Sequence, residues 1–141
     1  MSDLYDRAYS LAKAAHAGQV DKSGEDYILH PVTVASFVET DTQKAVALLH
    51  DVLEDTDVTE EELRSRFGNE ITDAVVAMTH PKGMPYMDYI ARIAENPLAK
   101  TVKMADLKHN MDLGRLKEVT ERDLKRVREK YEPAMDYLKK H

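Results

Sequence analysis

The sequence of 141 residues has no cysteine, and this absence excludes several kinds of chemistry. Without thiols, the chain forms no disulfide framework, no thiolate zinc site and no cysteine nucleophile. Any metal ion that it binds must therefore be held by histidine, aspartate or glutamate. The lack of cysteine also fits the reducing environment of the cytoplasm, where we expect the protein to be found.

Long apolar runs and an excess of positive charge are missing as well. No stretch approaches the ~20 apolar residues needed to span a bilayer, and the first ten residues lack the pattern of a secretory signal. The chain carries 20 basic and 26 acidic residues, a formal net charge of −6, which argues against a nucleic-acid-binding protein with a broad basic surface. We therefore expect neither a membrane nor a nucleic acid among its partners.

The sequence does contain a helical pattern of apolar residues. Hydrophobic residues make up 43% of the chain, enough for one core, and without an evident linker we expect a single domain over residues 1–141. Apolar side chains recur every three or four residues, and no segment shows the alternation of a strand. The pattern predicts an all-α bundle of about eight helices, at about 4–15, 31–38, 45–53, 60–67, 69–78, 86–95, 97–112 and 121–138.

Several residues mark the ends of these helices. Gly18 is expected to end the first helix, and Gly68 to separate the fourth from the fifth. Thr59 and Glu62 have the spacing of a capping box, and Thr120 can cap the last helix. Pro133 predicts a kink in that last helix, because proline removes a backbone donor.

The most informative motif follows the apolar segment 45–53, which we expect at the centre of the fold. His50 and Asp51 are followed at once by Glu54 and Asp55. On a continuous helix, residues four apart share a face, so His50 would lie with Glu54, and Asp51 with Asp55. Carboxylates beside a core need a cation, because burying an unpaired charge costs several kcal/mol or shifts the pKa. A divalent metal ion would supply it.

His30 and Asp106 can complete a metal site in the order H…HD…D. Imidazole and carboxylate ligands suit Mn²⁺, Fe²⁺, Zn²⁺ or Co²⁺, whereas Mg²⁺ and Ca²⁺ do not ordinarily recruit two histidines. Such an ion lowers the pKa of bound water and polarises a phosphoryl oxygen, as a phosphohydrolase requires. Glu54 and Asp55, just outside this set, could orient water or move protons.

Simpler interpretations exist for individual residues. An isolated His-Asp pair is usually a surface or hydrogen-bonded pair, so the metal hypothesis depends on the larger pattern. We expect His16 and His109 to pack or to form hydrogen bonds rather than to bind a metal. His80 lies in a segment rich in proline and glycine, and we expect it in an exposed loop.

Several sequence blocks closely resemble the hydrolase domain of the Rel/Spo alarmone enzymes, which belongs to the HD superfamily of metal-dependent phosphohydrolases. The blocks are AHAGQ at 15–19, KSGE at 22–25, YILHP at 27–31, ALLHDVLEDT at 47–56, FG at 67–68, VKMAD at 102–106 and HNM at 109–111. They keep the order of that family and cover most of the chain, which makes them far more specific than a lone HD dipeptide. With no synthetase domain following, the chain resembles a small stand-alone alarmone hydrolase.

The resemblance implies a helical HD fold and a set of site residues. It implies an Mn²⁺ ion held by His30, His50, Asp51 and Asp106. It also implies removal of the 3′-pyrophosphate from guanosine 3′,5′-bis(diphosphate) or its pentaphosphate relative, giving GDP or GTP and pyrophosphate. Glu54 and Asp55 match the catalytic pair of the family. Asn110 matches an active-site asparagine, and Lys22 and Ser23 fall on the loop that touches the nucleotide.

Two positions depart from the family. Asp21 stands where those hydrolases have an arginine that stacks on guanine, and Leu113 stands where a small hydroxyl residue is usual near the ribose. Phosphate binding must then rely on the ion and on nearby basic residues, among which the sequence does not choose: Lys22, Lys103, Lys108 or Arg115. We count four residues as candidate substrate-binding residues: Lys22, Ser23, Lys103 and Asn110.

Three functional hypotheses follow. The first is a metal-dependent hydrolase of guanosine 3′-pyrophosphates, with a small phosphorylated nucleotide as the expected partner. The second keeps the chemistry and changes the substrate to another nucleotide or phosphate ester, because of Asp21 and Leu113. The third is a metal-containing module that senses a nucleotide without turnover, against which the presence of Glu54 and Asp55 counts. The sequence does not indicate an oligomeric state.

Overall fold

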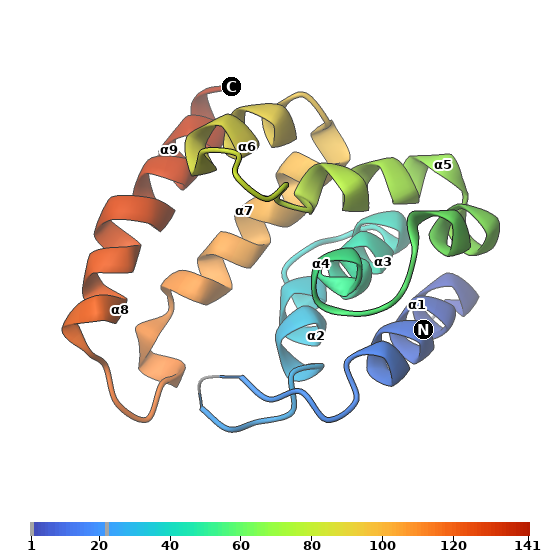
Figure 1. The fold of residues 1–141 in the computed structure, drawn as a ribbon, viewed down its shortest axis with the longest axis horizontal. Coiled ribbons are helices and arrows are strands. Elements are labelled where there is room, and N and C mark those ends of the chain that lie inside the picture. The colour runs from blue at the N-terminus through green and yellow to red at the C-terminus, as the bar shows by residue number, and fades with distance from the viewer. Residues whose placement is uncertain (1, 22) are drawn as a thin grey trace.

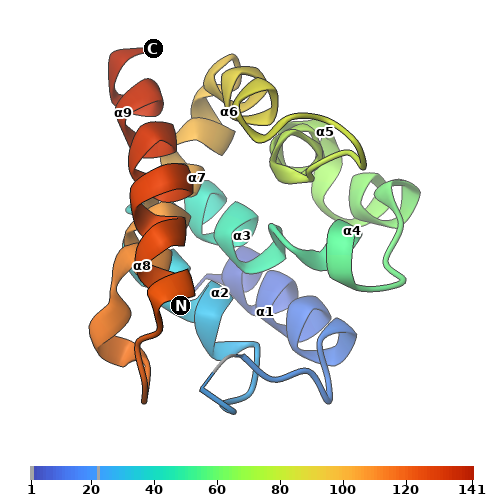
Figure 2. The ribbon, with the colours of Figure 1, turned by 60° about the vertical axis from the view of Figure 1, so that its left-hand side comes forward.

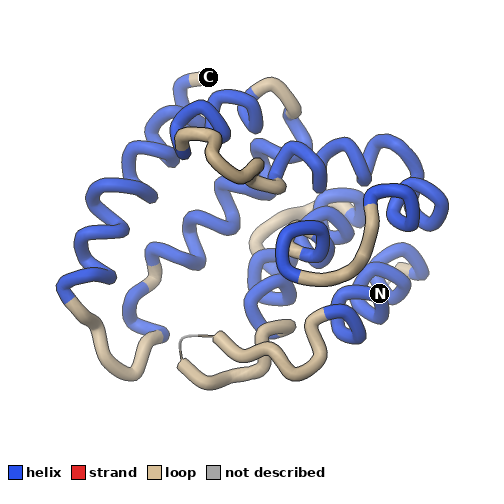
Figure 3. Tube along the Cα trace, in the orientation of Figure 1, coloured by secondary structure: helices blue, strands red, loops and turns tan. Residues whose placement is uncertain are grey.

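The computed structural model describes residues 2–21 and 23–141, and these residues form helices and no strand (Figure 3). The helices are α1 (Asp3–Ala15), α2 (Leu29–Ser36), α3 (Asp41–Leu49), α4 (Val52–Asp55), α5 (Glu60–Met78), α6 (Tyr86–Ala94), α7 (Pro97–Met111), the 3₁₀ turn η1 (Leu113–Arg115), α8 (Glu121–Arg126), the π-helical segment η2 (Val127–Tyr131) and α9 (Glu132–Lys140). The predicted all-α class is confirmed. None of the described helices is long and apolar enough to cross a membrane.

Helix α3 lies at the centre of the bundle, as expected from its apolar circumference. It packs against α1, α2, α5 and α7 (Figure 1). Every residue in its second half, 45–49, is completely buried. On the other side of α7, helices α6 and α9 pack against each other, so that α7 connects the two halves of the core.

The chain turns at His50 and Asp51, and this differs from the expected continuous helix. Helix α3 ends at Leu49 and the short helix α4 begins at Val52. The Asp51 backbone has φ −104° and ψ −2°, and its side chain caps no amide of α4. The helix is therefore interrupted, but the expected pairing of Asp51 with Asp55 is confirmed: the Asp55 amide donates to the Asp51 carbonyl at 3.0 Å, and carboxylate oxygens of the two lie within 4.8 Å of each other. The turn presents both the imidazole and the carboxylate of the His-Asp pair to the same space.

Other helix ends follow the sequence signals with one difference, at the start of α5. Gly68 interrupts α5 with φ 85° and ψ 176°, a conformation that glycine adopts at little cost. Thr59 accepts from the Glu62 amide, but Glu62 pairs with Arg66 (3.2 Å), so the structure shows one arm of the expected capping box.

The C-terminal helix runs from α8 through η2 into α9 as one long rod at the edge of the molecule (Figure 2). The capping box of Thr120 and Asp123 begins it, as expected. At Pro133 the helix continues into α9 after the π-helical η2, in which the Glu132 amide donates to the Val127 carbonyl, five residues back. The expected effect of Pro133 thus takes the form of a widened turn.

Candidate metal centre and active site

Three ligand groups meet beside α3 from three different parts of the chain. His30 lies in the first turn of α2, His50 in the turn after α3, and Asp106 on α7. One side-chain ligand atom of each lies within 4.8 Å of those of the other two. His30 Nε2 is 2.9 Å from Asp106 Oδ1, and His50 Nε2 is 3.4 Å from the same oxygen. Asp51 Oδ2 lies 3.1 Å from His50 Nε2, so the fourth predicted ligand borders the same point.

The tautomer of His50 suits metal binding. Its Nδ1 lies 2.5 Å from the Ala47 carbonyl, which only accepts, so this nitrogen carries the proton. Its Nε2 is buried and has no hydrogen-bond partner, although two carboxylates face it. A buried polar nitrogen without a partner is costly in a folded protein. A divalent ion between this nitrogen and the carboxylates would satisfy it, so the residues present fit a metal site.

Buried charge around Asp106 is compensated by Lys103. Lys103 Nζ donates to Asp106 Oδ2 at 2.9 Å, and Asn110 Nδ2 lies 3.3 Å from Oδ1. Burial alone would raise the pKa of Asp106, but Lys103 and the two histidines outweigh it and hold this pKa well below its usual value. For His50, burial likewise opposes the charge, and Asp51 and Asp106 reverse it to raise the pKa of the imidazole. A metal ion at Nε2 would therefore displace a proton from this nitrogen. Asp106 is therefore an ionised carboxylate at the floor of the site.

Asp51, Glu54 and Asp55 form a second group of carboxylates at the mouth of the site. The Tyr27 hydroxyl donates to Asp51 Oδ2, which orients that carboxylate. Glu54 Oε1 accepts from the backbone amide of His80 at 2.7 Å. Burial raises the pKa of both Glu54 and Asp55, and the charge of Asp51 adds to the effect. Such carboxyl groups exchange protons closer to neutral pH than ordinary ones.

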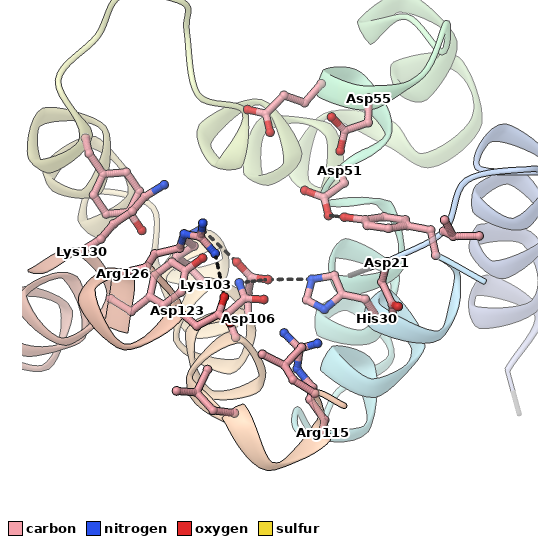
Figure 4. Close-up of a pocket in the computed structure, with 18 residues that line it drawn as sticks. Asp21, His30, Asp51, Asp55, Lys103, Asp106, Arg115, Asp123, Arg126 and Lys130 are labelled. Carbon is pink, nitrogen blue, oxygen red and sulfur yellow. Dashed lines mark hydrogen bonds and ion pairs between the residues drawn. The ribbon is translucent and has the colours of Figure 1, made fainter. Parts of the chain in front are cut away.

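A cavity of about 430 Å³ is lined by three of the four candidate ligands, His30, Asp51 and Asp106, and carries acidic and basic groups on different sides. Acidic groups from the turn after α3 and from α4 line one side, as Asp51 and Asp55 show in Figure 4. The other side is mainly basic, with Arg115 from η1, Arg126 from α8 and Lys130 from η2, and it also contains Asp123, whose Oδ1 lies 3.6 Å from Arg126 Nη1. Lys130 Nζ lies 4.6 Å from the centre of the Tyr86 ring. The cavity can accommodate a ligand that carries both a metal-binding group and further negative charge.

The predicted substrate-binding residues have different positions. Lys22 lies outside the described residues. Ser23 donates its hydroxyl to the Arg115 carbonyl at 3.4 Å, at the rim. Lys103 and Asn110 line the cavity, and each contacts Asp106. Of the remaining basic candidates, Arg115 lines the cavity, whereas Lys108 lies over the Phe37 ring, 4.7 Å from its centre, and lines a different groove.

The two departures from the family pattern, Asp21 and Leu113, both line the cavity. Asp21 Oδ1 accepts from the amides of Ser23 and Glu25 at 2.8 and 3.1 Å, so this carboxylate also holds the loop in shape. The charge of Asp21 and the apolar side chain of Leu113 therefore border the space that a ligand would occupy.

Some residues of the site escaped prediction from the sequence. His80 lies in the loop between α5 and α6, as expected, but it is half-buried rather than exposed, and its ring stacks on Tyr89 with centroids 4.6 Å apart. Arg126 and Lys130 belong to a charged helix whose sequence pattern is typical of a solvent-exposed surface, and no motif connects them to the metal ligands. His16 behaves as expected, being buried with Nδ1 3.0 Å from Gln19 Oε1.

A comparison with protein families matches the model for the HD domain to residues 8–117, a range that contains all four candidate ligands. The chain belongs to the HD domain family. Among known relatives, a "guanosine-3′,5′-bis(diphosphate) 3′-pyrophosphohydrolase" of Vibrio cholerae is 40% identical over 95 residues, covering 64% of this chain and 13% of the relative. A protein of the same name from Aquifex aeolicus is 37% identical over 117 residues, covering 74% of this chain and 17% of the relative.

The bifunctional (p)ppGpp synthase/hydrolase SpoT of Escherichia coli is 36% identical over 121 residues, covering 74% of this chain. This HD protein thus spans only 13–17% of the length of these curated relatives. Among solved structures, a metazoan SpoT ortholog, described as hydrolysing ppGpp, matches with a TM-score of 0.73. The match covers 99% of this chain and 96% of the ortholog's chain at 23% sequence identity, which establishes the shared fold. The resemblance to HD hydrolase domains is confirmed.

Proposed function

We propose that the protein is a divalent-metal-dependent phosphohydrolase that removes the 3′-pyrophosphate of guanosine 3′,5′-bis(diphosphate) and its pentaphosphate relative. One observation carries the proposal: the unpartnered, buried Nε2 of His50 faces Asp51 and Asp106, two carboxylates that line a cavity with basic groups on its far side. The names of the relatives from Vibrio cholerae and Aquifex aeolicus support this substrate.

The ligand set that we propose is His30, His50, Asp51 and Asp106. Two imidazole nitrogens with two carboxylates favour Mn²⁺, with Fe²⁺, Co²⁺ or Zn²⁺ as related possibilities. When bound, such an ion lowers the pKa of water and polarises a phosphoryl oxygen. The Tyr27 hydroxyl holds Asp51 in place, and Lys103 keeps Asp106 ionised.

The charges of the cavity fit the substrate. The guanosine substrate carries a diphosphate at each end of the ribose, and the acidic wall cannot neutralise this charge. We propose that the 3′ group lies toward the four ligands and that Arg115, Arg126 and Lys130 face the remaining phosphates. Guanidinium and ammonium groups form their strongest hydrogen bonds with such anions.

Glu54 and Asp55 are the proposed proton-handling residues. Their carboxyl groups stand at the mouth of the site and have raised pKa values because of burial and of Asp51. The amide of His80 holds the Glu54 carboxylate on the inner side of α4. From there Glu54 can orient water and accept its proton, and Asp55 can return a proton to the departing 3′ oxygen.

A second candidate keeps this chemistry with another nucleotide or phosphate ester. It is favoured by Asp21 and Leu113, which both line the cavity. An aspartate cannot stack on a base as a guanidinium does, and it repels a nearby phosphate.

Product analysis tests the proposal. Mn²⁺-loaded protein is incubated with guanosine 3′-pyrophosphates and with a panel of other nucleotides and phosphate esters, and products are separated by chromatography. We expect GDP or GTP and pyrophosphate, absent from a His50→Ala sample. Release from another compound alone would support the second candidate. Tight alarmone binding without products would instead indicate a sensing module and contradict both.

A further inference from the structure

His109 makes an unusual contact with the candidate ligand His30. Their Nδ1 atoms lie 2.7 Å apart, and their rings stack with centroids 5.0 Å apart and an interplanar angle of 17°. His109 follows Asp106 by three residues on α7, so both side chains reach His30 from the same helix, His109 at Nδ1 and Asp106 at Nε2. His109 does not line the cavity, and neither the proposed metal binding nor the proposed proton transfer uses it.

The contact allows two assignments of the shared proton. If His109 donates, a neutral His30 carries its proton on Nε2, which then cannot bind a metal ion. If His30 donates, its Nε2 keeps a lone pair. A metal ion could then be shared between this nitrogen and Asp106 Oδ1, which lies 2.9 Å away. The hydrogen bond of one ring nitrogen thus decides the chemistry of the other.

We propose that His109 is a positioning residue that accepts the Nδ1 proton of His30 and so fixes the tautomer and ring orientation needed for a metal ion at Nε2. This inference rests on the proposed function, because it takes His30 as a ligand. His50 is arranged in the same way by different means, since its Nδ1 contacts the Ala47 carbonyl. The two histidines of the site would then each have their outer nitrogen held by a protein acceptor.

The surroundings keep the His109 ring in this position. Phe37 makes an edge contact with it, with centroids 6.3 Å apart. The backbone carbonyl of His109 accepts a hydrogen bond from Arg115 Nε at 3.2 Å, and this contact survives replacement of the His109 side chain. Stacking on His30 and the edge contact with Phe37 restrain the ring, and its Nδ1 faces that of His30.

The test measures the affinity of metal-stripped protein for Mn²⁺ alone, by titration calorimetry, with no substrate present. His109→Leu should raise the dissociation constant by about 10–100-fold, the usual effect of losing such a partner. His109→Asn should stay within a few-fold of the wild type, because the asparagine oxygen can occupy the place of Nδ1. Phe37→Leu, which loses the packing contact but keeps the hydrogen bond, is the matched control.

Thermal melting of the metal-free variants separates positioning from folding. If the weaker Mn²⁺ binding of His109→Leu is only a result of lower stability, Phe37→Leu will lose affinity in the same proportion to its own fall in melting temperature. In that case the inference is wrong. It is also wrong if His109→Leu binds Mn²⁺ as the wild type does while His30→Ala does not. If His30→Ala itself retains full affinity, the proposed ligand set fails instead, and the two failures are thereby distinguished.

Discussion

Replacing Lys103 with methionine removes the ammonium group that neutralises Asp106 in the protein interior. The two side chains are buried, with exposed fractions of 9% and 4% for the residues, and their charged atoms are 2.9 Å apart. Removing one partner of a buried ion pair costs about 3–5 kcal/mol, since the other charge stays buried without compensation. Asp106 keeps contacts with His30 and Asn110, so we expect the lower end, about 3 kcal/mol.

Urea unfolding of the metal-free protein in the presence of a chelator measures this loss without an ion that could replace the ammonium. Lys108→Met on the same helix is the control, because Lys108 is exposed and its cation–π contact with Phe37 is worth about 0.5–1 kcal/mol. If the free energy of unfolding of Lys103→Met lies within about 1 kcal/mol of that of Lys108→Met, the buried ion pair does not stabilise the fold to the expected extent.

Three further predictions concern the turn in α5, the proton-handling residues and the loop beside the cavity. Gly68→Ala should destabilise the protein by about 1–3 kcal/mol in urea unfolding, because φ 85° with ψ 176° is strained for any side chain; an effect no larger than that of Gly114→Ala would contradict this. Glu54→Gln keeps an oxygen for the His80 amide and should lower kcat by about 10²–10⁴-fold with the bound Mn²⁺ unchanged, whereas full turnover would remove Glu54 from the mechanism. Asp21→Asn keeps the acceptor for two loop amides and should improve KM for guanosine 3′-pyrophosphates by reducing repulsion, so a worse KM would show that the charge itself recognises the substrate.

Much of the fold is local in origin and could be predicted for that reason. Gly18 and Gly68 end helices because of their own backbone freedom, and Thr120 caps the last helix through a residue three positions away. The break at His50 could not be predicted in the same way. The segment is apolar and helical in pattern, and Asp51 accepts a hydrogen bond from the hydroxyl of Tyr27, which is distant in the sequence.

The candidate site shows the same division. The order of His30, His50, Asp51 and Asp106 pointed to a shared site, and the structure brings their ligand atoms together. Of the basic residues that line the cavity, Arg115 was among the sequence candidates, whereas Arg126 and Lys130 were not predicted, because they reach the cavity through the packing of the C-terminal helix against α6 and α7.

Metal dependence of pyrophosphate release tests the central claim most directly. The wild type and Asp51→Asn are stripped of metal and given increasing amounts of Mn²⁺, and bound metal and pyrophosphate released from guanosine 3′,5′-bis(diphosphate) are measured in the same samples. We expect release by the wild type to rise in proportion to bound Mn²⁺ and to be lost in the variant together with its tight binding. Undiminished release from metal-free protein, or from Asp51→Asn, would contradict the account.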